Sequence, residues 1–154
     1  MQAHENPIYQ AQAILARRDH SEYEVRAKLA KKGFLPEQID EGVNWLKSRK
    51  LLDDEAFAKR YVESTLRLKQ VGPAWLILKL KEKHIAEHMI EPAVFGVLDP
   101  AKEEALAREA ANRWRTSHKR KPAEVDDEYR YRNRLQRFLV SRGFSFDVVQ
   151  AVLG

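Results

Sequence analysis

The sequence predicts an all-α protein built from three tandem three-helix repeats, each helix-turn-helix-like, in an elongated, curved array. Apolar residues recur at helical spacing, and no alternating apolar and polar run is long enough to indicate a strand. The six Gly and six Pro residues fall mostly between the helical stretches. The same apolar pattern also occurs three times along the 154 residues, which is typical of repeats that pack on their neighbours.

The helix starts are predicted from capping residues and from prolines. Ser21 with Glu24 forms a capping box, and Asp53 and Asp99 stand where N-cap residues are expected. Pro36, Pro73 and Pro100 stand at positions where a proline opens a helix. The expected helices cover residues 7–18, 21–32, 36–49, 53–69, 73–83, 87–97, 100–117, 127–142 and 146–153.

The helix ends and the repeat register are predicted from glycines. Gly33 and Gly143 each follow a basic residue, so we expect them to end a helix in the left-handed conformation. An offset of 51 residues places Ser21 on Gly72, and an offset of 110 residues places Gly33 on Gly143. Pro92 lies past the first turn of its helix and makes that helix the least regular one expected.

The register divides the chain into three predicted units, residues 1–51, 52–98 and 99–154. Matching apolar positions in these units have the spacing of helical core residues, so we expect each unit to have a small core. Units of this size are small for independent folding, which favours packing between neighbouring units. The structural positions that we single out are Leu29, Phe34, Leu80, Ile85, Leu139 and Phe144.

The composition excludes several classes of protein. The 28 Lys and Arg residues against 23 Asp and Glu give a net charge of +5, a mild basic bias that is largest after residue 100. The absence of Cys excludes disulfides, thiol nucleophiles and Cys-ligated metals. The longest apolar run covers only residues 74–78, and no leader-like segment opens the chain. We therefore expect a cytoplasmic protein that does not insert into a membrane.

No constellation of residues points to catalysis or to a cofactor. The chain has no Gly-rich phosphate loop and no nucleophile elbow. His84 and His88 have a helical spacing but lack a third ligand, so we expect no metal. The acidic run at residues 53–55 stands where a helix needs a cap and negative charge. The prediction is a protein that is not an enzyme and carries no cofactor.

The most coherent charged feature is a stripe of arginines in the helix expected at 127–142. Arg130, Arg134 and Arg137 fall on one face, and a basic loop of Lys119, Arg120 and Lys121 precedes the helix. The stripe could bind phosphates or an acidic protein face, because arginine suits both. A solvated helix face is the alternative, and the sequence does not decide between them.

A second candidate contact lies in the helix expected at 73–83. Trp75 and Leu78 lie roughly opposite the core face of this helix, and the matching positions in the other repeats are mostly charged. Apolar residues at such positions indicate a contact surface. The surface could face a partner protein or a neighbouring repeat.

Several segments resemble the bacterial RecX recombination regulators, in the family's order and over nearly the whole chain. They are residues 13–22, 25–34, 51–58, 72–73 and 137–144. Two departures concern the middle repeat. After Gly72 and Pro73 the family commonly has a run of the type Arg-Ile-x-x-Glu-Leu, whereas this chain has Trp-Leu-Ile-Leu-Lys-Leu at residues 75–80, and His84 replaces a common Gly. The contacts of the middle repeat are therefore the least transferable.

The resemblance implies a non-catalytic inhibitor of the RecA recombinase. Such a protein would bind the RecA–DNA filament and restrain filament growth, ATP hydrolysis, strand exchange and the coprotease activity of the SOS response, meeting single-stranded DNA through the filament. We expect a monomer. The alternative is a direct DNA-binding protein of tandem helix-turn-helix type, but the helices expected at 36–49 and 87–97 carry mainly acidic polar residues, which would approach phosphate unfavourably.

Overall fold

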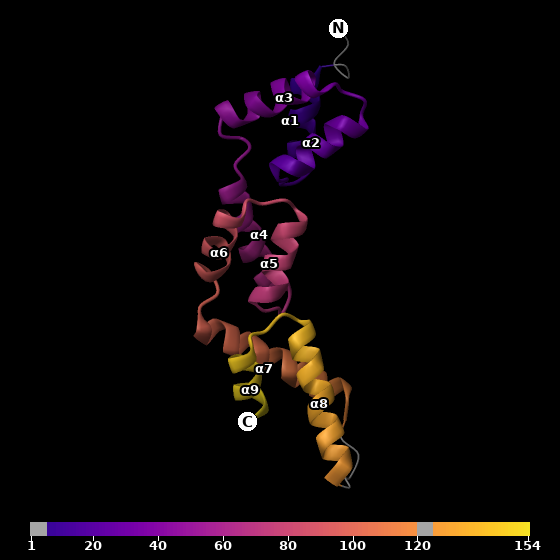
Figure 1. Cartoon of the computed structure of the whole chain (residues 1–154), viewed down its shortest axis with the longest axis vertical. Helices are drawn as coiled ribbons and strands as arrows, with labels where there is room; N and C mark the ends of the chain where they lie inside the picture. The colour runs from indigo at the N-terminus through magenta and orange to yellow at the C-terminus, as the bar shows by residue number, and fades with distance from the viewer. Residues whose placement is uncertain (1–5, 120–124) are drawn as a thin grey trace. The chain divides into compact units, whose positions relative to one another are not determined.

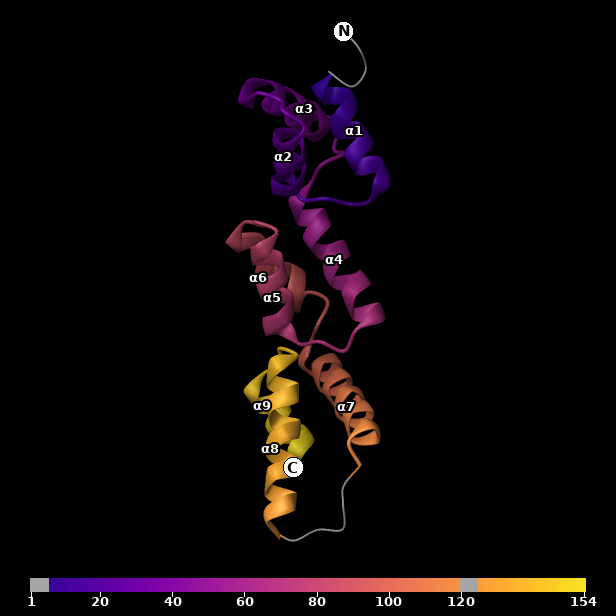
Figure 2. The same cartoon turned by 90° about the vertical axis from the view of Figure 1, so that its right-hand side faces the viewer.

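The computed structural model describes residues 6–119 and 125–154, and within these ranges every regular element is an α-helix (Figure 1, Figure 2). The all-α prediction is therefore confirmed. No helix in these ranges combines the length and apolar character needed to cross a membrane. The helices are α1 (Pro7–Arg17), α2 (Glu22–Lys31), α3 (Pro36–Ser48), α4 (Asp54–Leu68), α5 (Pro73–Glu82), α6 (Glu87–Phe95), α7 (Pro100–Ser117), α8 (Val125–Ser141) and α9 (Phe146–Leu153).

The helices start at the caps expected from the sequence. In α2 the Ser21 hydroxyl accepts the Glu24 N–H at 3.2 Å, and the Glu24 carboxylate accepts the Ser21 N–H at 3.1 Å, which completes the capping box. Asp53 and Asp99 each accept a backbone N–H from the turn that follows. A further cap, Asn6, accepts two N–H groups at the start of α1 and was not singled out in the sequence.

The helix ends use the left-handed conformation predicted for glycine. Gly33 has a φ of 92° and Gly143 a φ of 87°. The matching position of the second repeat holds His84, which adopts a φ of 55° without being glycine. Its ring stacks on Tyr23 with 3.6 Å between ring centroids, and this contact offsets part of the backbone strain.

Some boundaries differ from the expected ones by a residue or two. Helix α8 begins at Val125, two residues before the expected start. Helix α6 ends at Phe95, and Pro92 lies inside it, where its carbonyl accepts the Gly96 N–H at 3.0 Å. Differences of this size are ordinary at frayed helix ends.

The chain divides into two compact units. The first contains residues 1–61 and 80–90, and the second contains residues 62–79 and 91–154. Helices α4, α5 and α6 thus contribute residues to both units. The repeat boundaries after residues 51 and 98 follow the sequence register rather than this division, and they stay predictions.

In the first unit, α1, α2 and α3 pack against one another around an aliphatic core. Val25, Leu29 and Val43 have no exposed surface, and Phe34 is half-buried at the edge. Truncating a buried leucine such as Leu29 to alanine generally costs about 2–5 kcal/mol. The buried core residues here are Ala11, Ile14, Val25, Leu29, Ile39, Val43, Leu46 and Leu52.

In the second unit, α7, α8 and α9 surround a core that includes aromatic side chains. Leu139 has no exposed surface, and Phe144 is 4% exposed. The Trp114 ring meets Tyr131 edge-on, with 5.0 Å between centroids. Glu103 is also buried, and its carboxylate accepts the Ser145 N–H at 2.7 Å, which joins α7 to the start of α9. The other two structural positions, Leu80 and Ile85, are buried as part of the first unit.

The first unit contains a junction between the N-terminal end of α2 and the C-terminal end of α5. The Ser21 hydroxyl donates to the Lys83 carbonyl at 3.0 Å. Beside it, the Glu22 N–H donates to the Asp54 carboxylate at 2.8 Å. Burial raises the pKa of Asp54, although this hydrogen bond favours the ionised form.

The second unit contains a junction at the same register positions, between α5 and α8. The Gly72 N–H donates to the Arg142 carbonyl at 2.8 Å, and the Ala74 N–H donates to the Gly143 carbonyl at 3.0 Å. A Cβ atom at Gly72 or Gly143 would overlap backbone atoms of the other segment. Glycine is therefore required here by close backbone approach.

His20 predicts a pH dependence of the first unit. Its side chain is 1% exposed, Nδ1 lies 2.9 Å from the Arg18 carbonyl, and Nε2 is buried without a partner in the described residues. Burial lowers the pKa of His20 below its ordinary value, an effect reinforced by the charges of Arg18 and Lys28. The His20 side chain therefore binds a proton near pH 6.5 in the unfolded chain, but only at a lower pH in the folded unit.

The free energy of unfolding of this unit is expected to fall as the pH drops from about 7.5 to about 5.5. His20→Gln is expected to reduce this dependence. Urea unfolding followed by the fluorescence of Trp45, which lies in this unit, measures it. Equal pH dependence in both proteins would show that another group is responsible.

Candidate binding surfaces

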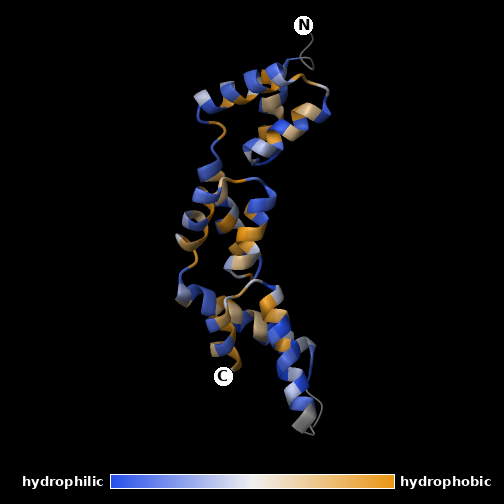
Figure 3. Ribbon diagram, in the orientation of Figure 1, coloured by the Kyte–Doolittle hydropathy of each residue, from blue (hydrophilic) through white to orange (hydrophobic). Residues whose placement is uncertain are grey.

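The predicted arginine stripe lies on the exposed side of α8. Arg130, Arg134 and Arg137 are all exposed, whereas Leu135 and Leu139 on the same helix are buried in the core of the second unit. Hydrophilic residues predominate along this helix (Figure 3). The burial of the leucines fixes the rotation of α8 and so directs the three guanidinium groups to solvent.

The stripe carries three positive charges on exposed side chains. In the part of the chain that the structure describes, none of its three arginines forms an ion pair. Arg134 lies 5.7 Å from the centroid of the Trp114 ring, a cation–π distance that leaves its charge available. Of the basic loop, Lys119 is exposed, while Arg120 and Lys121 lie outside the described residues.

A shallow hollow of about 390 Å³ lies beside α8 and combines aromatic and cationic side chains. Tyr129 is 68% exposed there, and Arg132, which the sequence analysis did not single out, is exposed as well. Tyrosine rings next to arginines are typical of surfaces that hold single-stranded nucleic acid by stacking and charge. The lining residues are Arg115, Glu128, Tyr129, Tyr131, Arg132, Leu135 and Leu153.

Trp75 and Leu78 occupy different environments on α5. Leu78 is 55% exposed, whereas Trp75 is half-buried. The amines of Lys69 and Lys79 lie 5.1 and 5.4 Å from the centroid of the Trp75 ring. The backbone of Trp75 also lies directly against Gly143. Trp75 therefore belongs to the junction within the second unit, and Leu78 is its solvent-exposed neighbour.

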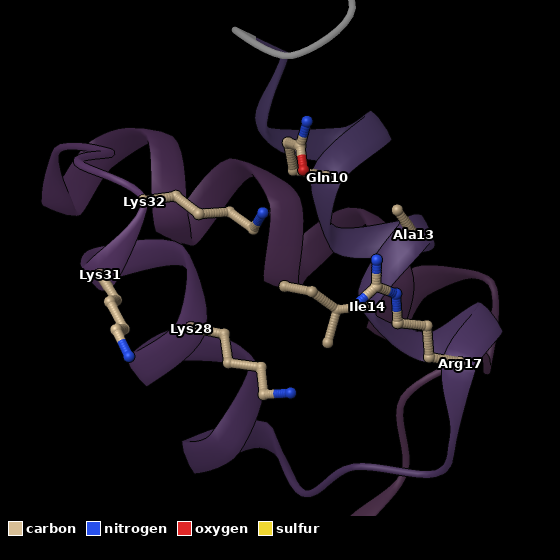
Figure 4. Close-up of a pocket in the computed structure, with 7 residues that line it drawn as sticks. All are labelled: Gln10, Ala13, Ile14, Arg17, Lys28, Lys31 and Lys32. Carbon is tan, nitrogen blue, oxygen red and sulfur yellow. The ribbon is translucent and has the colours of Figure 1, made fainter.

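A cationic groove between α1 and α2 was missed by the sequence analysis (Figure 4). It has a volume of about 480 Å³. The sequence does contain a signal, because Gln10, Ala13, Ile14 and Arg17 form one helical stripe. Of the lysines across the groove, the sequence analysis considered only the one before Gly33, as part of a helix end. The lining residues are Gln10, Ala13, Ile14, Arg17, Lys28, Lys31 and Lys32.

Asp53 and Asp54 of the acidic run and His84 of the histidine pair make contacts that support the fold. Asp53 caps α4, and Asp54 accepts a hydrogen bond at the junction with α2, a second role that spacing alone did not predict. His84 stacks on Tyr23, and His88 is exposed. Within the described ranges no group of three or more His, Cys, Asp or Glu side chains could hold a metal ion.

Helices α3 and α6 carry exposed acidic side chains. Glu37 and Glu41 are exposed on α3, and Glu87 and Glu91 are exposed on α6. These are the helices that would enter the major groove if the repeats bound DNA as helix-turn-helix modules. Carboxylates at these positions would approach the phosphates of the duplex, which disfavours that mode of binding.

The fold and its surfaces define a tandem three-helix repeat protein with exposed cationic surfaces. Three family models match it in chain order: "RecX, first three-helix domain" at residues 10–46, "RecX, second three-helix domain" at 53–94 and "RecX, third three-helix domain" at 102–153. The chain belongs to the RecX family of regulatory proteins.

Individual relatives agree with this assignment. The chain is 34% identical to a regulatory protein RecX of Vibrio campbellii over 91% of this chain and 84% of that protein. It is 32% identical to one of Prosthecochloris aestuarii over 95% and 90%. A crystal structure of a regulatory protein RecX superposes with a TM-score of 0.86 at 23% identity, covering 97% of this chain and 72% of the other, which shows the shared fold.

Proposed function

We propose that this chain is a non-catalytic inhibitor of the RecA recombinase that binds the RecA–DNA filament. In this role it restrains filament growth, ATP hydrolysis, strand exchange and coprotease activity, and it acts as a cytoplasmic monomer without a cofactor. The observation that carries the proposal is the match of all three RecX three-helix domains, in order, to one chain. Relatives of similar length bear the name regulatory protein RecX, which supports a regulatory role.

The charge on the third repeat supports contact with the nucleic-acid side of the filament. The exposed arginines of α8 can bind phosphates, and the exposed Tyr129 beside them can contact a base. Free DNA is the alternative target, since the same groups would bind it. The acidic faces of α3 and α6 argue against sequence-specific binding.

The test is a titration of this protein into RecA assembled on single-stranded DNA, with ATP hydrolysis and filament length as readouts. Inhibition is expected to saturate as protein is added and to leave the DNA chemically intact. Free RecA and bare DNA serve as binding controls. Chemical change in DNA or ATP caused by this chain alone, or full RecA activity at excess protein, would refute the proposal.

A further prediction concerns the apolar residues of α5. Leu78→Ser is expected to weaken filament binding about fivefold, because an exposed apolar contact is lost, while the free energy of unfolding changes by no more than about 0.5 kcal/mol. Trp75→Ala is expected to lower that free energy by roughly 1–3 kcal/mol, because a half-buried aromatic side chain is truncated. Urea unfolding and filament co-sedimentation measure the two effects.

The matched control is Leu68→Ser, since Leu68 is 80% exposed at the end of α4 and was not predicted to contact a partner. It is expected to leave both stability and filament binding unchanged. If Leu78→Ser bound the filament as well as the unchanged protein, Leu78 would not be part of a contact surface.

A further inference from the structure

The groove between α1 and α2 has an aliphatic floor and a cationic rim. Ala13 and the edge of Ile14 form the floor on α1 (Figure 4). Lys28 and Lys32 extend toward this floor from α2 (Figure 4). The exposed surface inside the groove is therefore mostly apolar, and the charges lie around it. Such a groove suits a ligand that is apolar in the middle and anionic at its sides.

The charges of the rim have no anionic partner in the described structure. Arg17, Lys28, Lys31 and Lys32 form no ion pair with any described residue. Acids of the same repeat pair with cations elsewhere: Asp19 with Arg60, Glu22 with Lys47, Glu24 with Arg18, and Asp40 with Arg26. The rim thus concentrates four positive charges that no described residue of the repeat neutralises.

We propose that this groove binds an acidic amphipathic peptide segment of a partner protein. An apolar side chain of the segment packs on Ala13 and Ile14, and flanking carboxylates pair with the four cations of the rim. The groove belongs to the first repeat and is a different surface from the arginine stripe of α8. The proposal does not rest on the identity of the partner, so it stands or fails separately from the proposed inhibition of RecA.

The chemistry of the groove favours a peptide over a nucleic acid. No aromatic side chain is among its described lining residues, so bases would find no ring on which to stack. The rim is lysine-rich and lies toward the C-terminal ends of α1 and α2, where backbone carbonyls rather than N–H groups are exposed. Phosphate sites typically use N–H groups at helix N-termini, which this groove lacks.

The test measures binding of a fluorescein-labelled synthetic peptide of glutamate and leucine to the full chain by fluorescence anisotropy. Two control peptides replace every glutamate with glutamine or every leucine with serine. Oligothymidylate is used as a competitor, and sedimentation velocity checks whether a second copy of the chain occupies the groove. The glutamate and leucine peptide is expected to bind, and both control peptides are expected to bind at least about tenfold more weakly.

Paired variants place the binding site. Ala13→Glu adds a carboxylate to the floor and is expected to weaken peptide binding about tenfold or more. Ala16→Glu is the control, because Ala16 is exposed on the same helix but does not line the groove. Lys28→Gln with Lys32→Gln is expected to weaken binding and to reduce its salt dependence.

The control for the lysine pair is Lys59→Gln with Lys81→Gln, which changes the charge equally at exposed positions outside the groove. Equal peptide binding by Ala13→Glu and Ala16→Glu would overturn the proposal. Loss of oligothymidylate binding in Ala13→Glu, without loss of peptide binding, would assign the groove to nucleic acid instead. Self-association that Ala13→Glu abolishes, in place of peptide binding, would assign it to a second copy.

Discussion

Gly143→Ala is expected to lower the free energy of unfolding of the second unit by roughly 3 kcal/mol or more. Two effects add. Alanine is strained at a φ of 87°, and its Cβ would overlap the backbone of Trp75. The nearest atoms are N, Cα and Cβ of Trp75, whose positions are set by the backbone, so a side-chain rotation cannot relieve the overlap. Urea unfolding followed by the fluorescence of Trp75 and Trp114 measures the effect.

Gly33→Ala is the matched control for this prediction. Gly33 has a φ of 92°, but a Cβ there would meet no atom within 4 Å. Only the backbone strain applies, so the expected cost is about 1 kcal/mol. If both variants lost the same free energy, the close approach at Gly143 would contribute nothing, and the junction would be looser than described.

Replacing Arg130, Arg134 and Arg137 together with glutamine is expected to weaken binding to the RecA filament on single-stranded DNA by about 10- to 100-fold at low salt. Three exposed cations without an ion-pair partner among the described residues are lost at once. The slope of log affinity against log salt is expected to become shallower by about 2, as three phosphate contacts predict. Far-UV circular dichroism is expected to stay unchanged, because the three side chains lie outside the core.

The control variant changes Arg67, Arg108 and Arg113 to glutamine, which removes the same charge from exposed positions of the same unit. Arg108 already pairs with Glu104, and Arg113 with Gln70, so these side chains are less available to a ligand. A similar loss of binding in both variants would indicate an effect of net charge alone. If the slope of log affinity against log salt stayed unchanged in the α8 variant, the stripe would be a solvated helix face that does not contact phosphates.

The fold could be predicted closely because its signals are local. Capping at Ser21 and Asp99 and the left-handed glycines at 33 and 143 depend on a few consecutive residues. The repeat register also corresponds to observed contacts. The Ser21 hydroxyl donates to the Lys83 carbonyl, and at the matching positions the Gly72 N–H donates to the Arg142 carbonyl. These features follow from backbone chemistry that any sequence at those positions must satisfy.

The candidate surfaces were predicted less completely because they depend on packing. The arginine stripe is a property of one helix and could be found from spacing. The groove forms only when α1 and α2 lie at a particular distance from each other. The spacing of residues along each helix does not reveal that distance. The different exposure of Trp75 and Leu78 likewise depends on the close approach of Gly143, which lies far along the chain.

The two junctions have a consequence for how such a chain can evolve by duplication. A tandem copy of the second repeat would place the equivalent of His84 where Gly143 now stands against Trp75, and even a Cβ atom does not fit there. In this structure His84 lies instead beside Tyr23, at the start of the first repeat's second helix. The repeats are thus not interchangeable modules. Copying the second repeat in tandem would first require glycine in place of His84, because the equivalent position in the third repeat has no room for a Cβ atom.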